Sequence, residues 1–235
     1  MLAPSASIFL AALLATPFAA AHGKIAVVTG DFGGNGTALG IKGAVVPGAG
    51  SNSKTETDTT TFNVGSNNCG ETEAATGVKV AMALSGSTLP QISTDNASIS
   101  GTFHIVTSDG AGPVIAMVDT TGQGNFANAA KATVTTQVPG TKGNIKKTTK
   151  RWEDLMIRAG LMKRATNINE DYPFAVAIPA GITCTGTVAG QTNVCMVKIS
   201  NNNAAGPFGG CVVVQQSGTN STIAAKRTIS QPLKV

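Results

Sequence analysis

Histidine is scarce in this chain of 235 residues, which contains only His22 and His104. Aromatic residues make up 4% of the chain, with one Trp and one Tyr, so a flat binding surface of several aromatic rings is hard to build. No serine lies in a Gly-x-Ser-x-Gly elbow, which argues against a hydrolytic triad of that type. Any histidine chemistry must therefore use these two residues.

Long hydrophobic runs are also missing. The apolar run Ile8–Ala15 is too short to span a bilayer but has the length of a signal-peptide core. Ala19, Ala20 and Ala21 supply a small-residue cleavage signature, although no Lys or Arg precedes the run. We predict that residues 1–21 are a signal peptide, that the mature chain begins at His22, and that the protein is extracellular.

Charge is sparse and unevenly placed, because charged residues make up only 12% of the chain and the net charge is +5. Residues 142–164 hold eight of the 17 basic residues and two of the 12 acidic ones, so the rest is close to neutral. A near-neutral body argues against a broad face for nucleic acid, and no second apolar run predicts a membrane anchor. We expect no nucleic-acid or membrane partner and a monomer.

Cysteine is limited to four residues, and none forms a Cys-x-x-Cys pair of the kind that binds zinc. In an exported chain four cysteines indicate two disulfides with three alternative pairings. Cys184 and Cys195 flank a turn at residues 186–190, so a strand-turn-strand would bring them together. Cys69 and Cys211 then pair by elimination.

The composition, rich in Gly, Thr, Val and Ser, favours short strands and tight turns over helices. We predict one all-β sandwich domain over residues 22–235, with residues 30–50 and 51–77 as loops. The predicted strands are Val78–Leu84, Ile99–Thr107, Val114–Asp119, Ala132–Val138, Phe174–Ile178, Val194–Ile199, Cys211–Gln216 and Thr222–Thr228. One helix is predicted at Trp152–Ala159, inside the basic insertion 142–164.

That insertion carries two dibasic pairs, Lys150-Arg151 and Lys163-Arg164. One interpretation is cleavage by a secretory endoprotease, after which the Cys69–Cys211 bridge would hold the two parts together. The other is solvated surface charge on a loop. Three Asn-x-Ser/Thr acceptors, which begin at Asn35, Asn96 and Asn220, are consistent with a glycoprotein.

His22 and His104 together predict a copper site. A histidine at a free amino terminus offers its α-amine and ring Nδ1, and one nitrogen from His104 would complete a three-nitrogen set of the kind that Cu²⁺ prefers. The alternative is that His104 is an ordinary strand histidine and that His22 is incidental to processing. The absence of any other histidine favours the joint interpretation.

Several long motifs carry a resemblance. The segments "HGKIAVVTGDFGGNGTALGIKGAVVPGAG" and "SGTFHIVTSDGAGPV" resemble a family of fungal virulence factors of appressoria, over nearly the whole mature chain. The initial His-Gly and the run "NVCMVKISNNNAAGPFGGC" are similar to fungal lytic polysaccharide monooxygenases and their copper-binding relatives. The second resemblance implies an immunoglobulin-like or fibronectin-like sandwich with a histidine brace formed by His22 and His104.

The same resemblance implies further site residues. Phe208 and Gln215 are candidates for the catalytic surroundings of the copper, with Tyr172 as a rival to Phe208. Asp109 is a candidate third metal ligand, because some copper-binding relatives use a carboxylate there. The resemblance thus implies a secreted virulence-associated copper protein that acts at cell-wall polysaccharide by oxidative cleavage. The alternatives are a non-catalytic protein that binds glycan or a host surface, and a copper-handling protein.

Overall fold

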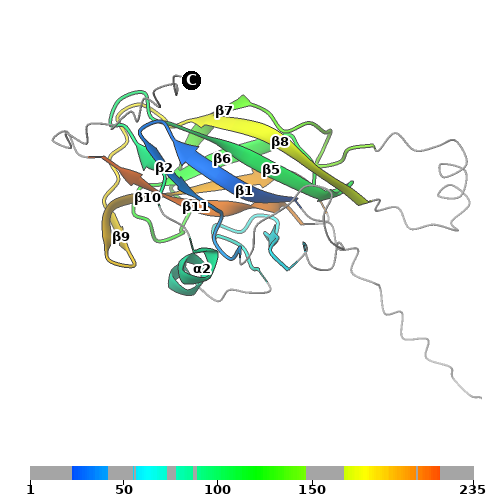
Figure 1. The fold of residues 1–235 in the computed structure, drawn as a ribbon, viewed down its shortest axis with the longest axis horizontal. Coiled ribbons are helices and arrows are strands. Elements are labelled where there is room, and N and C mark those ends of the chain that lie inside the picture. Colours follow the sequence, from blue (N-terminus) through cyan, green and yellow to red (C-terminus); the bar gives the residue numbers. More distant parts are fainter. Residues whose placement is uncertain are drawn as a thin grey trace, which may run out of the picture.

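The computed structural model describes residues 23–41, 55, 57–72, 78–86, 89–146, 167–204 and 206–217. The described part is built almost entirely from strands (Figure 1). The elements are β1 (Gly23–Gly30), β2 (Gly33–Gly36), β3 (Thr60–Thr61), α2 (Val78–Ser85), β4 (Gln91–Ile92), β5 (Ser98–Thr107), β6 (Val114–Asp119), β7 (Ala130–Thr136), β8 (Asn167–Ala177), β9 (Gly186–Val188), β10 (Gln191–Asn201) and β11 (Phe208–Gln216).

The strands form one large sheet in the order β2-β1-β5-β8-β7-β6-β10-β11-β3, with β9 beside β10 and β4 beside β11. The pairings are antiparallel except that of β4 with β11. In Figure 1 the blue, green and yellow strands β1, β5 and β8 run side by side across one layer. The prediction of a fold dominated by strands is confirmed, with one short helix, α2, among the described residues. The immunoglobulin-like sandwich stays a prediction, because the strands pair into one sheet.

Two buried clusters hold the sheet together. The larger draws on both halves of the sheet, with Ile25 and Phe103 from one half and Val197 and Val212 from the other. The second cluster lies under the loops and α2, where Phe62 and Ala81 contact the face of β10 that carries Met196. Burial of apolar area on both faces of β10 stabilises the strand, at roughly 25 cal/mol for each Å² removed from water.

Most predicted strands are present, and one is wrong. The prediction Val114–Asp119 coincides with β6, and the observed β5, β7, β8, β10 and β11 overlap their predicted ranges with longer or shifted ends. Val78–Leu84, predicted as a strand, belongs to the helix α2. Ala, Met and Leu favour a helix there, and Gly86 ends it in the left-handed region with φ of 58°.

Five of the observed strands were not predicted. β1 and the two-residue β4 were overlooked, β2 and β3 fall within residues predicted as loops, and β9 occupies the first part of the predicted turn 186–190. Glycine weakens strand propensity, but β2 begins directly after a tight turn from β1, and its first residue, Gly33, has a φ of 93°, which glycine adopts without strain. The hairpin therefore follows from the same glycines that indicated a loop.

The structure joins Cys69 to Cys211 and Cys184 to Cys195, the two pairings predicted from the sequence. β9 and β10 flank the turn that brings the second pair together. No helix among the described residues has the length and apolar character needed to cross a membrane. The predicted signal peptide, His22, the helix at 152–159, both dibasic pairs and the strand at 222–228 lie outside the described residues.

Candidate functional site

His104 lies on β5, which is the middle one of three neighbouring strands. It is directly opposite Lys24 of β1 on one side and Asp171 of β8 on the other. Its side chain is 1% exposed, and its Nδ1 lies 2.6 Å from Asp171 Oδ1. A carboxylate accepts and cannot donate, so Nδ1 carries the proton and donates it to Asp171. A metal ion would therefore have to bind His104 through Nε2.

Lys24 extends this line of polar groups toward a loop. Its side chain is 2% exposed, and its Nζ donates to Asp58 Oδ2 at 3.2 Å. Burial lowers the pKa of Lys24, while the carboxylates of Asp58 and Asp171 act in the opposite direction. We call the four residues Asp58, Lys24, His104 and Asp171 the polar row.

Irregular pairing surrounds the polar row on both sides. The β1–β5 ladder shifts register between Ile25 and Val27, and the β5–β8 ladder shifts between Ile105 and Thr107. Bulges of this kind redirect side chains and are frequent beside functional sites. Both shifts begin one residue away from the pair formed by Lys24 and His104.

The start of β1 is pressed against the loop after β5. A Cβ on Gly23 would lie 2.2 Å from the carbonyl oxygen of Gly110 and 2.5 Å from the ring of Phe103, so only glycine fits. The neighbouring Asp109 has a buried Oδ1 with no hydrogen-bond partner among the described residues. Its loop is fixed by a 2.8 Å hydrogen bond from Asn203 Nδ2 to the Asp109 carbonyl.

The described residues contain no group of three or more His, Cys, Asp or Glu placed to hold a metal ion. His22 lies outside them, but its chain neighbour Gly23 pairs with Ile105, one residue from His104. The structure thus brings the start of β1 and His104 together on adjacent strands. The loop of Asp109 lies against the same end of β1.

Phe208 and Gln215 occupy opposite ends of β11. Phe208 is buried at the end nearer to Gly23, and its backbone N–H donates to Asn201 Oδ1 at 2.8 Å. Gln215 lies seven residues further, which is about 23 Å along a strand. There it bonds Gln91, which contacts Gly30 at the far end of β1.

Gln215 is therefore not brought to His104, and Phe208 and Gln215 cannot both flank one ion. Residue spacing alone did not show this, because it does not reveal that β1 and β11 run in the same direction.

Tyr172 faces away from the polar row. It pairs with Phe103 and packs against the larger core cluster, on the opposite side of the sheet from His104, because side chains alternate along a strand. Its hydroxyl donates to a carboxylate oxygen of Glu170. This hydrogen bond, with burial and the charge of Glu170, raises the pKa of Tyr172 to about 12.

Because Tyr172 is the only tyrosine, tyrosinate absorbance reports on it alone. We expect a titration midpoint near pH 12 in the native protein, and a midpoint nearer the usual value of about 10 in Glu170→Gln. Between these values the unfolded chain loses the proton first, so stability falls as the pH rises. Glu71→Gln, at a distant exposed acid, should leave the midpoint unchanged, and a wild-type midpoint near 10 would contradict the assignment.

Sequence reasoning missed several members of the site. Lys24, Asp58 and Asp171 were not predicted, because only strand register places them beside His104. A lysine at the start of an apolar strand was the one signal available for Lys24.

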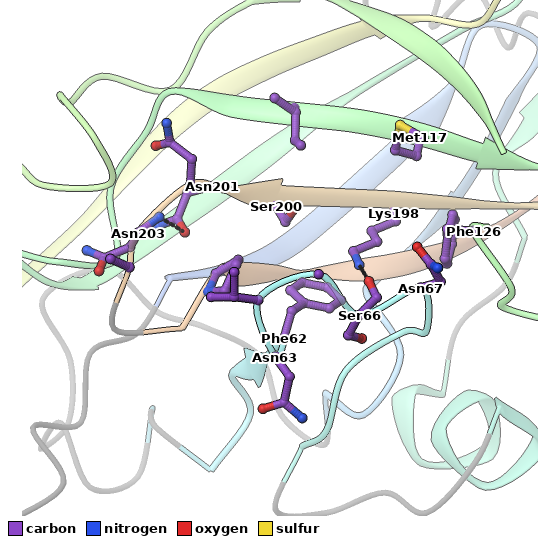
Figure 2. Close-up of a pocket in the computed structure, with 16 residues that line it drawn as sticks. Phe62, Asn63, Ser66, Asn67, Met117, Phe126, Lys198, Ser200, Asn201 and Asn203 are labelled. Carbon is purple, nitrogen blue, oxygen red and sulfur yellow. Dashed lines mark hydrogen bonds between the residues drawn. The ribbon is translucent and has the colours of Figure 1, made fainter. Parts of the chain in front are cut away.

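A second feature, a cavity of about 500 Å³, was also missed. It lies against β6 and β10 and the loop at residues 62–67 (Figure 2).

The described part of the chain is thus a disulfide-linked, mostly β protein in which a buried histidine bonds a partly exposed carboxylate beside the start of the first strand. Residues 20–209 match the family model of Egh16-like virulence factors, and the chain belongs to this family. The virulence-factor family predicted from the motifs is therefore confirmed. The resemblance to polysaccharide monooxygenases stays a prediction.

Two relatives come from Pyricularia oryzae (strain 70-15). The chain is 35% identical to "Appressoria-specific virulence factor GAS1" over 238 residues, which covers 97% of this chain and 85% of that protein. It is 38% identical to "Appressoria-specific virulence factor GAS2" over 159 residues, which covers 67% of this chain and 47% of that protein. No solved structure matches the chain.

Proposed function

We propose that this protein is a secreted virulence factor of the appressorium that binds Cu²⁺ through His22 and His104 and acts at cell-wall polysaccharide. The names of the relatives support the virulence role, and the two disulfides are consistent with export. An immunoglobulin-like sandwich would suit this role, because it presents the start of its first strand at one end of the molecule.

The observation that carries the copper proposal is the hydrogen bond from His104 Nδ1 to Asp171, on the strand next to Gly23. Metal-binding histidines almost always donate their second ring N–H to a carboxylate or carbonyl, which fixes the tautomer and the ring orientation. Asp171 does this for His104. His22, joined covalently to Gly23, would add its α-amine and ring Nδ1.

The surrounding charges also suit a cation. Asp171 and Asp58 carry two negative charges against the single positive charge of Lys24, and the buried Oδ1 of Asp109 lies in the adjoining loop. A set of amine and imidazole nitrogens favours Cu²⁺ over harder cations. Bound copper would supply one-electron chemistry toward oxygen species, while His22 and His104 bind it and Asp171 orients the ring of His104.

A second candidate is copper handling without glycan cleavage. The placement of Gln215 and Tyr172 favours it, because Gln215 lies at the far end of β11 and the side chain of Tyr172 is on the other face of the sheet from His104. Both functions use the same ligands, so they share the test for binding and differ only in the test for turnover.

Copper titration of the mature chain tests the binding proposal. We expect one tight site with a type-2 spectrum in electron paramagnetic resonance and a loss of affinity of about 100-fold or more in His104→Ala. An alanine added before His22 should have a similar effect, because it removes the free amine of the histidine. Asp171→Ala should weaken binding by about 10- to 100-fold.

Ser100→Ala, an exposed position on the same strand, is the matched control and should bind copper normally. Equal affinity in the wild type and the alanine-extended chain would refute the proposal, as would exported protein that begins elsewhere than His22. The copper-loaded protein is then incubated with chitin, cellulose and pectin and a reductant. Oxidised products favour cleavage, and their absence from all three favours copper handling.

A further inference from the structure

The cavity described above is built on the half of the sheet that does not carry the polar row. Its floor is formed by outward-facing residues of β6 and β10, among them Met117 and Lys198. The loop that contains Phe62 and Ser66 forms one wall, and Figure 2 shows the Lys198 side chain directed toward Ser66 at that wall. A volume of about 500 Å³ is within the range of small-molecule sites, about 300–1,000 Å³.

Lys198 is the charged group of this cavity. Its side chain is 9% exposed, and its Nζ donates to the backbone carbonyls of Ser66 at 2.9 Å and Asn68 at 3.2 Å. The same nitrogen lies 4.3 Å from the centroid of the Phe62 ring and 5.5 Å from that of Phe126. These distances are within the range of cation–π attraction.

The charge of Lys198 is not neutralised by any acid among the described residues, whose ion pairs are Lys24–Asp58 and His104–Asp171. Burial alone lowers the pKa of Lys198, with no carboxylate acting against it. Buried charges are normally paired, because taking an ion out of water is costly. An ammonium has three N–H donors, and the two carbonyls use two of them, which leaves one for a ligand.

The rest of the cavity is largely apolar and reaches the surface. Ile115, on β6, is 50% exposed, and Phe62 and Met117 also line the space. Val64, on the wall loop, is 74% exposed. A ligand that fills this space gains binding free energy by removing apolar surface from water. Its charged end must be an anion to pair with Lys198. Both requirements are met by an amphipathic carboxylate.

The walls are fixed before any ligand arrives. Phe62 N–H donates to the carbonyl of Pro207 at 2.8 Å, and Phe126 N–H donates to the carbonyl of Asn67 at 2.7 Å. The loop is also tied to β11 through the Cys69–Cys211 bridge. A pre-formed cavity spares a ligand the cost of ordering the loop, which favours binding.

We propose that this cavity binds a small amphipathic carboxylate, of the size of octanoate, with its carboxylate on the Lys198 ammonium and its hydrocarbon chain along Ile115 and Met117. The site is independent of copper, because it shares no residue with the polar row. The ligand class follows from charge complementarity and the apolar lining.

Calorimetric titration of the mature protein with octanoate tests the proposal. Lys198→Met leaves an unbranched apolar side chain that is shorter by one atom and removes the charge, and we expect it to weaken octanoate binding by about tenfold or more, since a hydrogen bond to a charged group is lost. Lys146→Met, at an exposed lysine that does not line the cavity, is the matched control and should bind like the wild type. Ile115→Asp changes an exposed position at the rim of the cavity and should also weaken octanoate binding. It tests the proposal even if Lys198→Met impairs folding.

Three further probes decide the ligand class. Octanol lacks the charge and acetate lacks the hydrocarbon chain, so both should bind at least about tenfold more weakly than octanoate. Equal binding of octanol would overturn the role assigned to Lys198. Tighter binding of galacturonate than of octanoate would replace the proposal with a site for acidic sugars, and no octanoate binding at millimolar concentration would refute it outright.

Discussion

Replacing both Cys69 and Cys211 by alanine is expected to lower the free energy of unfolding by about 5 kcal/mol. The bridge joins residues 142 positions apart, and in the chain-entropy model the stabilisation grows with the length of the closed loop, reaching about 4.7 kcal/mol for 100 residues. It also ties the loop that walls the cavity to β11. Urea denaturation monitored by circular dichroism measures the effect.

The second disulfide provides the matched control. Cys184 and Cys195 are only 11 residues apart, so the double alanine variant should lose about 3 kcal/mol or less by the same model. Each disulfide connects β10 or β11 to an adjoining segment, which makes the losses of stability in the two double variants comparable. Equal losses in the two variants, or a larger loss for the short loop, would contradict the argument from loop entropy.

Gly101→Ala is expected to cost about 3 kcal/mol, at the upper end of the usual cost of overpacking. An added Cβ would lie 1.9 Å from the carbonyl oxygen of Val27 and 3.0 Å from the Phe174 ring. The Val27 oxygen belongs to the backbone of β1 and cannot rotate away, so β1 and β5 would have to separate. The same ladder pairs Lys24 with His104.

Thermal unfolding monitored by circular dichroism measures this loss. Ser100→Ala changes the neighbouring exposed position of β5 and should stay within about 0.5 kcal/mol of the wild type. If Gly101→Ala also unfolded like the wild type, β1 and β5 would not lie as close as the structure places them. Copper affinity of the folded fraction should fall as well, since β5 carries His104 and β1 begins directly after His22.

Local patterns predicted the elements whose signal is short-range. Alternating apolar residues located β5 and β6, and the turn between Cys184 and Cys195 predicted their pairing. The failure at Val78–Leu84 is equally local, because helix and strand propensities conflict in a short apolar run. In the structure this segment is a helix, and its residue Ala81 belongs to the buried cluster that includes residues of β10 and β11.

The candidate site was predictable only in part. The scarcity of histidine singled out His22 and His104, but the partners of His104 depend on register between strands far apart in sequence. Asp171 is 67 residues from His104, and a shift of one residue would turn it to the other face of the sheet. Gln215 failed as a neighbour of His104 for the same reason, since its position depends on the direction of β11.

The amino-acid sequence by itself determined the family, the all-β class, the cysteine pairs and the two histidines, because these follow from composition, motifs and spacing along the chain. Only the tertiary structure decided that His104 bonds Asp171, that Gln215 and Tyr172 do not face His104, and that Lys198 lies in a cavity with no acidic partner among the described residues. The physical reason is that strand pairing joins residues by register and direction, which depend on the packing of the whole sheet rather than on any one segment.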